Sequence, residues 1–151
     1  MEYKGLDKIN QKLLSLLIED SRISYAEMAR QTHLSRVAVR ERINNMIEEG
    51  IISRFTTVVA AEKVGYPLAV FLEITVEPHL LEKIAEQLGT KERIKVVYQL
   101  TGAATLHVQA FLENPDALAK FLQKEVYPIE GIKNVESYML LKKFKSDLTV
   151  R

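Results

Sequence analysis

Apolar side chains recur at helical spacing near the start of the chain. Asp7 precedes them as a candidate N-cap. Leu14 and Ile18 add a second stripe, which is wider than a small three-helix core needs. The pattern predicts a first helix that is either buried on all sides or in contact with a second subunit. Its main stripe is Ile9, Leu13, Leu16 and Leu17.

Two further helix starts follow in close succession. Ser24 and Glu27 have the spacing of a capping box, in which the hydroxyl accepts from an orphan amide and the Glu reaches back. Ser35 is the next candidate cap. A hydrophobic staple is predicted at each start, from the pairs Ile23 and Met28, and Leu34 and Val39.

The helix after Ser35 is predicted to end at Gly50, with Ile51 contacting Met46 in a Schellman motif. Two short helices joined by a tight turn predict a helix-turn-helix, whose second helix enters the major groove of DNA. Any helical hairpin has caps and stripes, so the exposed residues must decide its role. The expected buried stripe is Val39, Ile43, Met46 and Ile47.

The exposed face of this second helix favours DNA binding. Its third position is Ala38 rather than Glu, so the free amides and the helix dipole remain available to a phosphate held with Ser35. Arg matches guanine edges and phosphates, and Asn matches adenine. Arginines are frequent in and around the hairpin: Arg22, Arg30, Arg36, Arg40 and Arg42.

Each candidate DNA contact has an expected role. Arg36 and Arg40 are expected to read base edges, and Asn44 to make a further base or phosphate contact. The apolar Val37 and Ala38 suit thymine methyl groups. Tyr25 is expected at the DNA backbone, and Arg42 to brace the fold. The full predicted set is Tyr25, Ser35, Arg36, Val37, Ala38, Arg40, Glu41 and Asn44.

Residues 51–60 are rich in β-branched and aromatic residues, which predicts a strand or short wing. Gly65 and Pro67 then interrupt the pattern and mark the best boundary in the chain. We therefore predict a DNA-binding domain at 1–59, a hinge at 60–67 and a second domain at 68–151.

The second domain alternates strands with helices. Helices are predicted from Pro78 to Gly89 and from Asn114 to near Pro128. This β-α-β-β-α-β order predicts a ferredoxin-like fold, so the whole chain is expected to be α+β. The bare sheet face would be a large exposed patch, which predicts pairing with a second copy. The predicted strands are 68–76, 93–101, 105–113 and 135–143.

Composition narrows the functions. The 151 residues have a net charge of +1, so DNA binding must come from a local patch. There is no cysteine, which excludes disulfides, thiolate metal sites and Cys nucleophiles. No apolar run can span a bilayer and no signal peptide begins the chain, which predicts a cytoplasmic, nucleoid-associated protein without membrane contact.

Several local sequences together resemble the Lrp/AsnC (feast/famine) family of prokaryotic transcriptional regulators. The resemblance implies a winged helix-turn-helix joined to an αβ-sandwich effector domain of the RAM/ACT-like type. It also implies dimers formed through the sheets and larger assemblies such as tetramers or octamers. The matching residues are Leu6-Asp7, Ala29, Leu34-Ser35, Arg42-Ile43, Glu49-Gly50-Ile51-Ile52, Val64-Gly65-Tyr66 and Thr101-Gly102.

Many family members bind an amino acid near the hairpin that here carries Gly102. The family usually continues this Gly with an acidic residue, whereas the present chain has alanines. Either the effector is an unusual amino acid or related metabolite, or the protein has no small-molecule input. The predicted effector residues are Gln99, Thr101, Gly102, Ala103, Ala104 and Thr105.

We therefore predict a sequence-specific regulator that binds a pseudo-palindromic operator in double-stranded DNA. An enzyme is disfavoured, because the three histidines lie on separate elements and no phosphate-binding glycine loop is present. Neither a cofactor nor a metal is expected. The remaining alternative is a protein–protein adaptor whose basic face meets an acidic partner.

Overall fold

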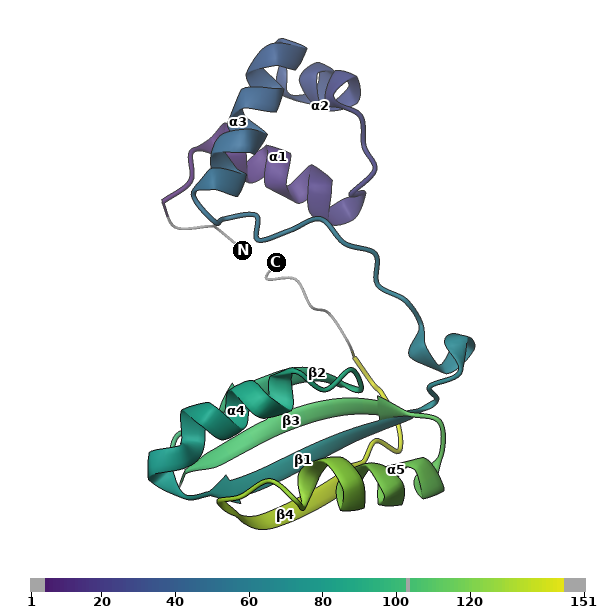
Figure 1. Cartoon of the computed structure of the whole chain (residues 1–151). Coiled ribbons are helices and arrows are strands. Elements are labelled where there is room, and N and C mark those ends of the chain that lie inside the picture. The colour runs from purple at the N-terminus through teal and green to yellow at the C-terminus, as the bar shows by residue number, and fades with distance from the viewer. Residues whose placement is uncertain (1–4, 103, 146–151) are drawn as a thin grey trace. The chain divides into compact units, whose positions relative to one another are not determined.

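The computed structural model describes residues 5–102 and 104–145 (Figure 1). Two compact units meet in sequence between Val58 and Val59. The second unit contains residues 60–67, the segment expected to be a hinge, and this segment includes a 3₁₀ helix at Ala61–Val64. Each unit has its own hydrophobic core.

The first unit consists of the helices α1 (Lys8–Glu19), α2 (Tyr25–Thr32) and α3 (Arg36–Glu48). The three predicted N-caps are confirmed: Asp7 accepts from the amide of Asn10 at 2.7 Å, and Ser24 and Ser35 each accept at 3.1 Å. The core takes one stripe from each helix: Leu13, Leu16, Leu17, Met28, Ala29, Val39, Ile43 and Met46, joined by Ile52. Leu14 packs against this core and is half-buried, as is Ile18.

The turn between α2 and α3 is held by backbone geometry. His33 adopts a left-handed conformation with φ 56°, and it is the one non-glycine residue with positive φ among the residues described. The amides of His33 and Leu34 both donate to the carbonyl of Ala29. These bonds satisfy the end of α2 and let α3 begin at once after Ser35.

Several details of the first unit differ from the sequence prediction. The carboxylate of Glu27 binds Arg30 and Gln31, which lie on its own face of α2, instead of returning to Ser24. Ile47 is 41% exposed rather than buried. At the end of α3, the amide of Ile52, not that of Ile51, donates to the carbonyl of Met46. The apolar residue buried after the helix is therefore Ile52 rather than the predicted Ile51.

The predicted wing is wrong in this chain. Residues 53–60 form no strand, and their apolar members Phe55, Val58 and Val59 are more than half exposed. A strand needs a partner for its amides and carbonyls, and no described segment of this chain pairs with residues 53–60. The β-rich composition alone therefore does not produce a wing.

The second unit has the predicted β-α-β-β-α-β order. Its four strands form one sheet in the order β2-β3-β1-β4, in which neighbours are antiparallel. The α+β, ferredoxin-like prediction is confirmed. The bounds are β1 Leu68–Val76, α4 Leu81–Gly89, β2 Ile94–Gln99, β3 Thr105–Leu112, α5 Pro115–Phe121 and β4 Ile132–Met139.

Some boundaries differ. Pro78 begins a short 3₁₀ turn (Pro78–Leu80) before α4, and Gly89 is the last residue of α4 rather than its stop. The helix α5 continues as a π-helical turn, Leu122–Val126. The last strand runs from Ile132 to Met139 rather than from 135 to 143, because its residues pair with β1 from Val76↔Ile132 to Val70↔Met139. Beyond it, the amide of Leu140 still donates to the carbonyl of Ala69.

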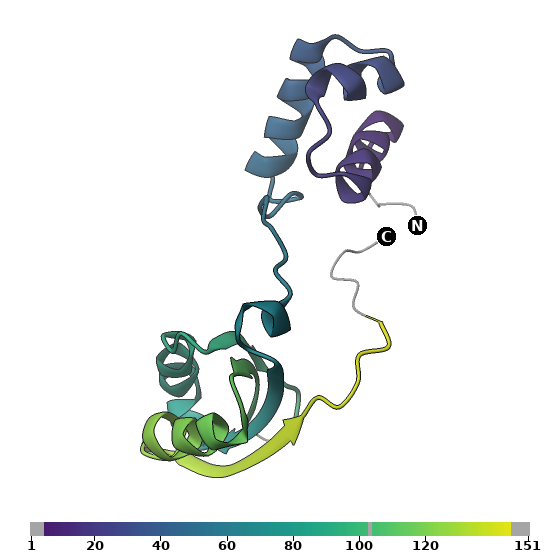
Figure 2. The ribbon, with the colours of Figure 1, turned by 90° about the vertical axis from the view of Figure 1, so that its right-hand side faces the viewer.

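Both helices cover the same face of the sheet (Figures 1 and 2). Alternate residues of β1, namely Val70, Leu72 and Ile74, are fully buried beneath them, as the alternation predicted. The opposite face, which we call the open face, carries half-buried Phe71, Glu73 and Thr75. The sheet therefore has one buried face and one accessible face.

Replacing Leu106 with alanine is expected to destabilise the second unit by about 2–5 kcal/mol, because Leu106 is fully buried and the change leaves a cavity. Native-state hydrogen exchange of the β1 and β3 amides measures this unit alone. The matched control is Leu141→Ala at a 96% exposed position, where a change within about 0.5 kcal/mol is expected. Equal effects of the two variants would contradict the core assignment.

Candidate functional site

The N-terminus of α3 is an exposed group of backbone donors. Ser35 caps the helix through the amide of Ala38, while the amides of Arg36 and Val37 precede the first intrahelical bond. The first turn contains no acidic residue. The positive end of the helix dipole is therefore not neutralised locally, and it can receive an anion such as a phosphate.

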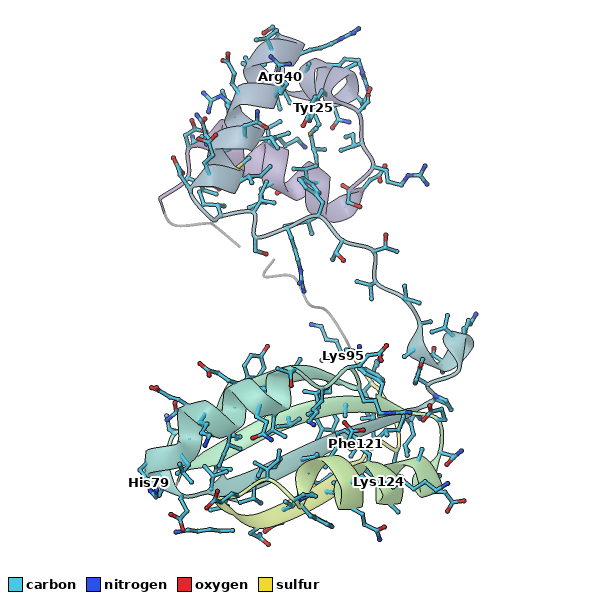
Figure 3. The ribbon with its side chains drawn as sticks, in the orientation of Figure 1. Tyr25, Arg40, His79, Lys95, Phe121 and Lys124 are labelled. Atoms are coloured by element: carbon cyan, nitrogen blue, oxygen red, sulfur yellow. The ribbon has the colours of Figure 1, made fainter. Side chains whose placement is uncertain are left out.

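The predicted DNA contacts gather around this helix start. On α3, the exposed positions lie opposite the buried stripe, and Ala38 is half-buried between them. Val37 is 55% exposed and Tyr25, at the start of the adjacent α2, is 41% exposed. Figure 3 labels Tyr25 and Arg40 on these two helices. The exposed polar members are Arg36, Arg40, Glu41 and Asn44.

Tertiary structure divides the five arginines into two groups. Arg30 Nη2 lies 2.6 Å from Glu27 Oε1, and Arg42 Nη1 lies 2.6 Å from Asp7 Oδ2. Within residues 5–102 and 104–145, the guanidinium groups of Arg22, Arg36 and Arg40 have no hydrogen bond or ion pair. Two of the three, Arg36 and Arg40, lie on the exposed face of α3, so this face keeps free guanidinium donors.

Arg42 braces α3 against α1. Its Nη1 donates to Asp7 and also to Asn10 Oδ1 at 3.0 Å, which ties the start of α1 to the middle of α3. The pKa of Asp7 is lowered by the hydrogen bond from the Asn10 amide and next by Arg42. This contact agrees with the bracing role expected for Arg42.

Glu27 and Arg30 neutralise one another on α2. Hydrogen bonds from Arg30 and then Gln31 lower the pKa of Glu27 to about 2, so the carboxylate is charged at neutral pH. The spacing of three residues on a helix was a signal that could have revealed this pair. No such local signal exists for Arg42 and Asp7, which are 35 residues apart.

The β2–β3 hairpin has a simple geometry. Gly102 has φ 111°, and the amide of Leu100 donates to Thr105. Ala104 packs against the core, and its carbonyl accepts from Val76. Gln99 and Thr101 are exposed and Thr105 is half-buried, whereas Ala103 lies outside the described residues. Polar groups for a ligand therefore come from Gln99, Thr101 and Thr105 rather than from Ala104.

In the described part of the chain, no three His, Asp or Glu side chains come close enough to one another to hold a metal ion. No helix among the same residues is both long and apolar enough to cross a membrane.

The sequence matches two family descriptions that together span most of the chain. Residues 6–47 match the AsnC-type helix-turn-helix domain, and residues 69–150 match the Lrp/AsnC ligand binding domain. The chain belongs to the Lrp/AsnC family of transcriptional regulators. This result confirms the resemblance seen in the sequence.

Relatives and solved structures agree with this assignment. An HTH-type transcriptional regulator of Pyrococcus furiosus is 33% identical over 89% of this chain and 91% of its own length. One of Pyrococcus horikoshii is 31% identical over 89% and 85%. Both relatives are named as HTH-type transcriptional regulators.

Two solved structures have the same fold. LrpC of B. subtilis has a TM-score of 0.83 at 26% identity, covering 95% of this chain and 99% of its own. A transcriptional regulator of Neisseria meningitidis in complex with L-Met has a TM-score of 0.89 at 22% identity, covering 97% of both chains. The latter likeness shows the fold alone.

Replacing Arg42 with Met is expected to destabilise the first unit by up to about 1 kcal/mol, the usual range of partly exposed ion pairs. Asp7 has a lowered pKa in the folded state, so its stabilisation is complete above its unfolded pKa and is lost as pH falls. The variant should lose less stability than the wild type between neutral pH and pH 3. Denaturation across this range measures both effects.

Arg22→Met is the matched control, because Arg22 is exposed and its guanidinium has no partner among the described residues. This control should keep the pH dependence of the wild type. An Arg42→Met protein whose stability falls with acid as steeply as the wild type would refute the brace.

Proposed function

We propose that this Lrp/AsnC regulator binds double-stranded DNA sequence-specifically through the exposed face of α3. One observation carries the proposal: the unpaired side chains of Arg36 and Arg40 lie on the same helix as a capped N-terminus without acidic residues. Arg side chains supply bidentate donors to guanine, and the helix start supplies amides to phosphate. The same helix can therefore bind the DNA phosphate backbone, which orients it, and contact the base edges.

The individual roles follow from position along α3. Ser35 and the amides of Arg36 and Val37 hold a phosphate, which sets the depth of the helix in the groove. Arg40, one turn further on, reaches a base edge, and Asn44 follows one turn later. Val37 and half-buried Ala38 offer apolar contact to thymine methyls, while Tyr25 contacts the DNA backbone from α2. Glu41 lies beside Arg40 and suits the amino group of cytosine.

The open face of the sheet supports a dimer. It exposes Tyr98 by 62% and Tyr138 by 48%. Half-buried Phe71 stands directly opposite Tyr138, and Tyr98 stands opposite His107 in the neighbouring row of the sheet. A second copy would cover these rings by sheet-to-sheet packing. A two-fold dimer presents two α3 helices, so the operator is a pseudo-palindrome with half-sites separated by whole helical turns. Assembly into tetramers or octamers would follow from further contacts of such dimers.

Arg40→Ala is expected to weaken operator binding by roughly 1–3 kcal/mol and to relax base choice at one position in each half-site. Arg40→Lys is the sharper variant, because it keeps the charge but lacks the planar fork of donors. It should therefore lose specificity while keeping most of the affinity for random DNA. Titration of operator and scrambled duplexes at one fixed salt concentration measures both quantities. Unchanged base preference in both variants would contradict the assignment.

The salt dependence of the affinity distinguishes DNA binding from the alternative of a protein–protein adaptor. Binding to a duplex releases condensed counterions, so the logarithm of the affinity should fall linearly with the logarithm of salt concentration. Because Arg36 is proposed to read a base edge, Arg36→Ala should weaken operator binding and leave this slope nearly unchanged. No retention of any duplex at low salt, with capture of an acidic protein instead, would favour the adaptor.

The hairpin is the proposed site of an effector. Gln99, Thr101 and Thr105 supply polar groups around Gly102, and the solved Neisseria regulator carries L-Met. No carboxylate is present in residues 99–105 to hold an ammonium group, so the effector is an amino acid held differently or a related metabolite. The same lack of a carboxylate favours the second candidate, a regulator controlled only by its abundance.

A thermal-shift screen against amino acids and their analogues tests the hairpin. A ligand of the folded state is expected to raise the melting temperature saturably, because it stabilises that state by mass action. Gln99→Ala should reduce this rise, whereas Gln87→Ala, which removes an equivalent amide from α4, should not. A panel with no saturable rise would support the regulator without a small-molecule effector.

A further inference from the structure

The structure contains a cavity that none of the predicted sites includes. It has a volume of about 390 Å³ and lies within the second unit, between the 3₁₀ helix Ala61–Val64 and the ends of β2 and β3. This size is at the lower end of the range of small-molecule pockets, about 300–1,000 Å³. Its lining is Val59, Ala61, Val64, Tyr66, Glu92, Arg93, Lys95 and Phe111.

The cavity is separate from the hairpin that carries Gly102. Arg93 and Lys95 lie at the start of β2 and Phe111 at the end of β3, whereas the hairpin joins the opposite ends of these strands. The five residue steps of β2 correspond to about 17 Å of extended chain. A ligand in the cavity therefore cannot be the ligand proposed at the hairpin.

Lys95 reaches the cavity because β2 is irregular there. The register with β3 shifts between Ile94↔Ala110 and Val96↔Gln109, which leaves Lys95 as an extra residue. Such a bulge redirects a side chain away from the regular alternation. The ammonium group of Lys95, which is labelled in Figure 3, donates to the carbonyl of Glu92 at 2.5 Å. Two further donors of this ammonium group remain for a ligand.

The charged side chains that line the cavity differ in whether they have a partner of opposite charge. Arg93 is already paired, since its Nη1 lies 2.5 Å from Glu113, and this hydrogen bond raises the pKa of Arg93. Lys95 has no carboxylate partner within the described residues. The side chain of Glu92 likewise has none there. Lys95 is thus the free cation of the cavity and Glu92 its free anion.

The remaining walls are apolar. Val59, Val64 and the half-buried ring of Phe111 line the cavity together with Tyr66. The 3₁₀ helix that carries Val64 is closed by Gly65, whose φ of 98° turns the chain, and by a bond from the Tyr66 amide to Ala61. This closure holds one wall in place before any ligand binds.

We propose that this cavity binds a small carboxylate that carries an apolar side chain. Lys95 receives the carboxylate through charge-assisted hydrogen bonds, and the walls of Val59, Val64 and Phe111 bury the side chain. Two sources share this chemistry, namely a 2-oxo acid and the corresponding amino acid. Glu92 distinguishes the two ligands, because only the amino acid has an ammonium group that can pair with its carboxylate.

Isothermal titration of the full chain with phenylpyruvate, phenylalanine, 4-methyl-2-oxopentanoate and leucine tests the proposal. Saturable binding of at least one compound is expected. Lys95→Met should weaken it at least about tenfold, because a charge-assisted hydrogen bond is lost. Lys133→Met removes an exposed lysine of β4 outside the cavity and should leave the affinity unchanged.

A second pair of variants guards against simple unfolding. Val64→Asp places a carboxylate at the cavity, and Val64 is 57% exposed, so the fold should tolerate it. It should abolish binding by repulsion, whereas Val58→Asp, at a 76% exposed position outside the cavity, should not. Ligand-induced NMR shifts should centre on the amides of Tyr66 and Phe111.

Glu92→Gln identifies the source of the ligand that binds the unmodified chain. Binding that weakens in this variant indicates the amino acid, and binding that is unchanged indicates the 2-oxo acid. No saturable binding of any of the four compounds overturns the proposal. Binding that survives Lys95→Met and Val64→Asp but is lost in Gln99→Ala also overturns it, and assigns the ligand to the hairpin. DNA binding, tested separately through Arg40, remains a distinct result.

Discussion

The central strand β1 can bury only one of its two faces, and the second unit depends on this constraint. Val70, Leu72 and Ile74 take the core face beneath α4 and α5, and the period of two then forces Phe71 and Glu73 to the other side. Glu73 stands directly opposite His107 on β3 and Glu136 on β4. The open face is therefore mixed in character, with aromatic rings beside charges.

In the first unit, the positions at which the helices begin and end determine which of their faces are buried. Three side-chain caps and the left-handed His33 start and stop the helices within a few residues, so each helix presents one stripe to a shared core. Because these apolar residues take one side of α3, Arg36 and Arg40 are left on the other. The acid-free start of α3 completes the surface that we propose for DNA recognition, so this surface follows from how the small core is closed.

Much of this could be predicted from local sequence. Caps at Asp7, Ser24 and Ser35, the alternation along β1 and the helix start at Asn114 each depend on neighbours within a few residues. Two failures concern pairing between strands. Residues 51–60 have strand composition but no partner strand among the described residues, and the last strand ends at Met139, beyond which the amide of Leu140 still donates to Ala69 of β1.

The sequence by itself determined the order of elements, the buried stripes, the arginine-rich second helix of the hairpin and the family, because these are encoded in spacing and short motifs. Only the tertiary structure decided which arginines are free, since Asp7 neutralises Arg42 from another helix. It also created the cavity at Lys95, where a bulge in β2 meets a 3₁₀ helix about thirty residues earlier in the chain. Through-space pairing and strand register arise from folding, and no local spacing in the sequence records them.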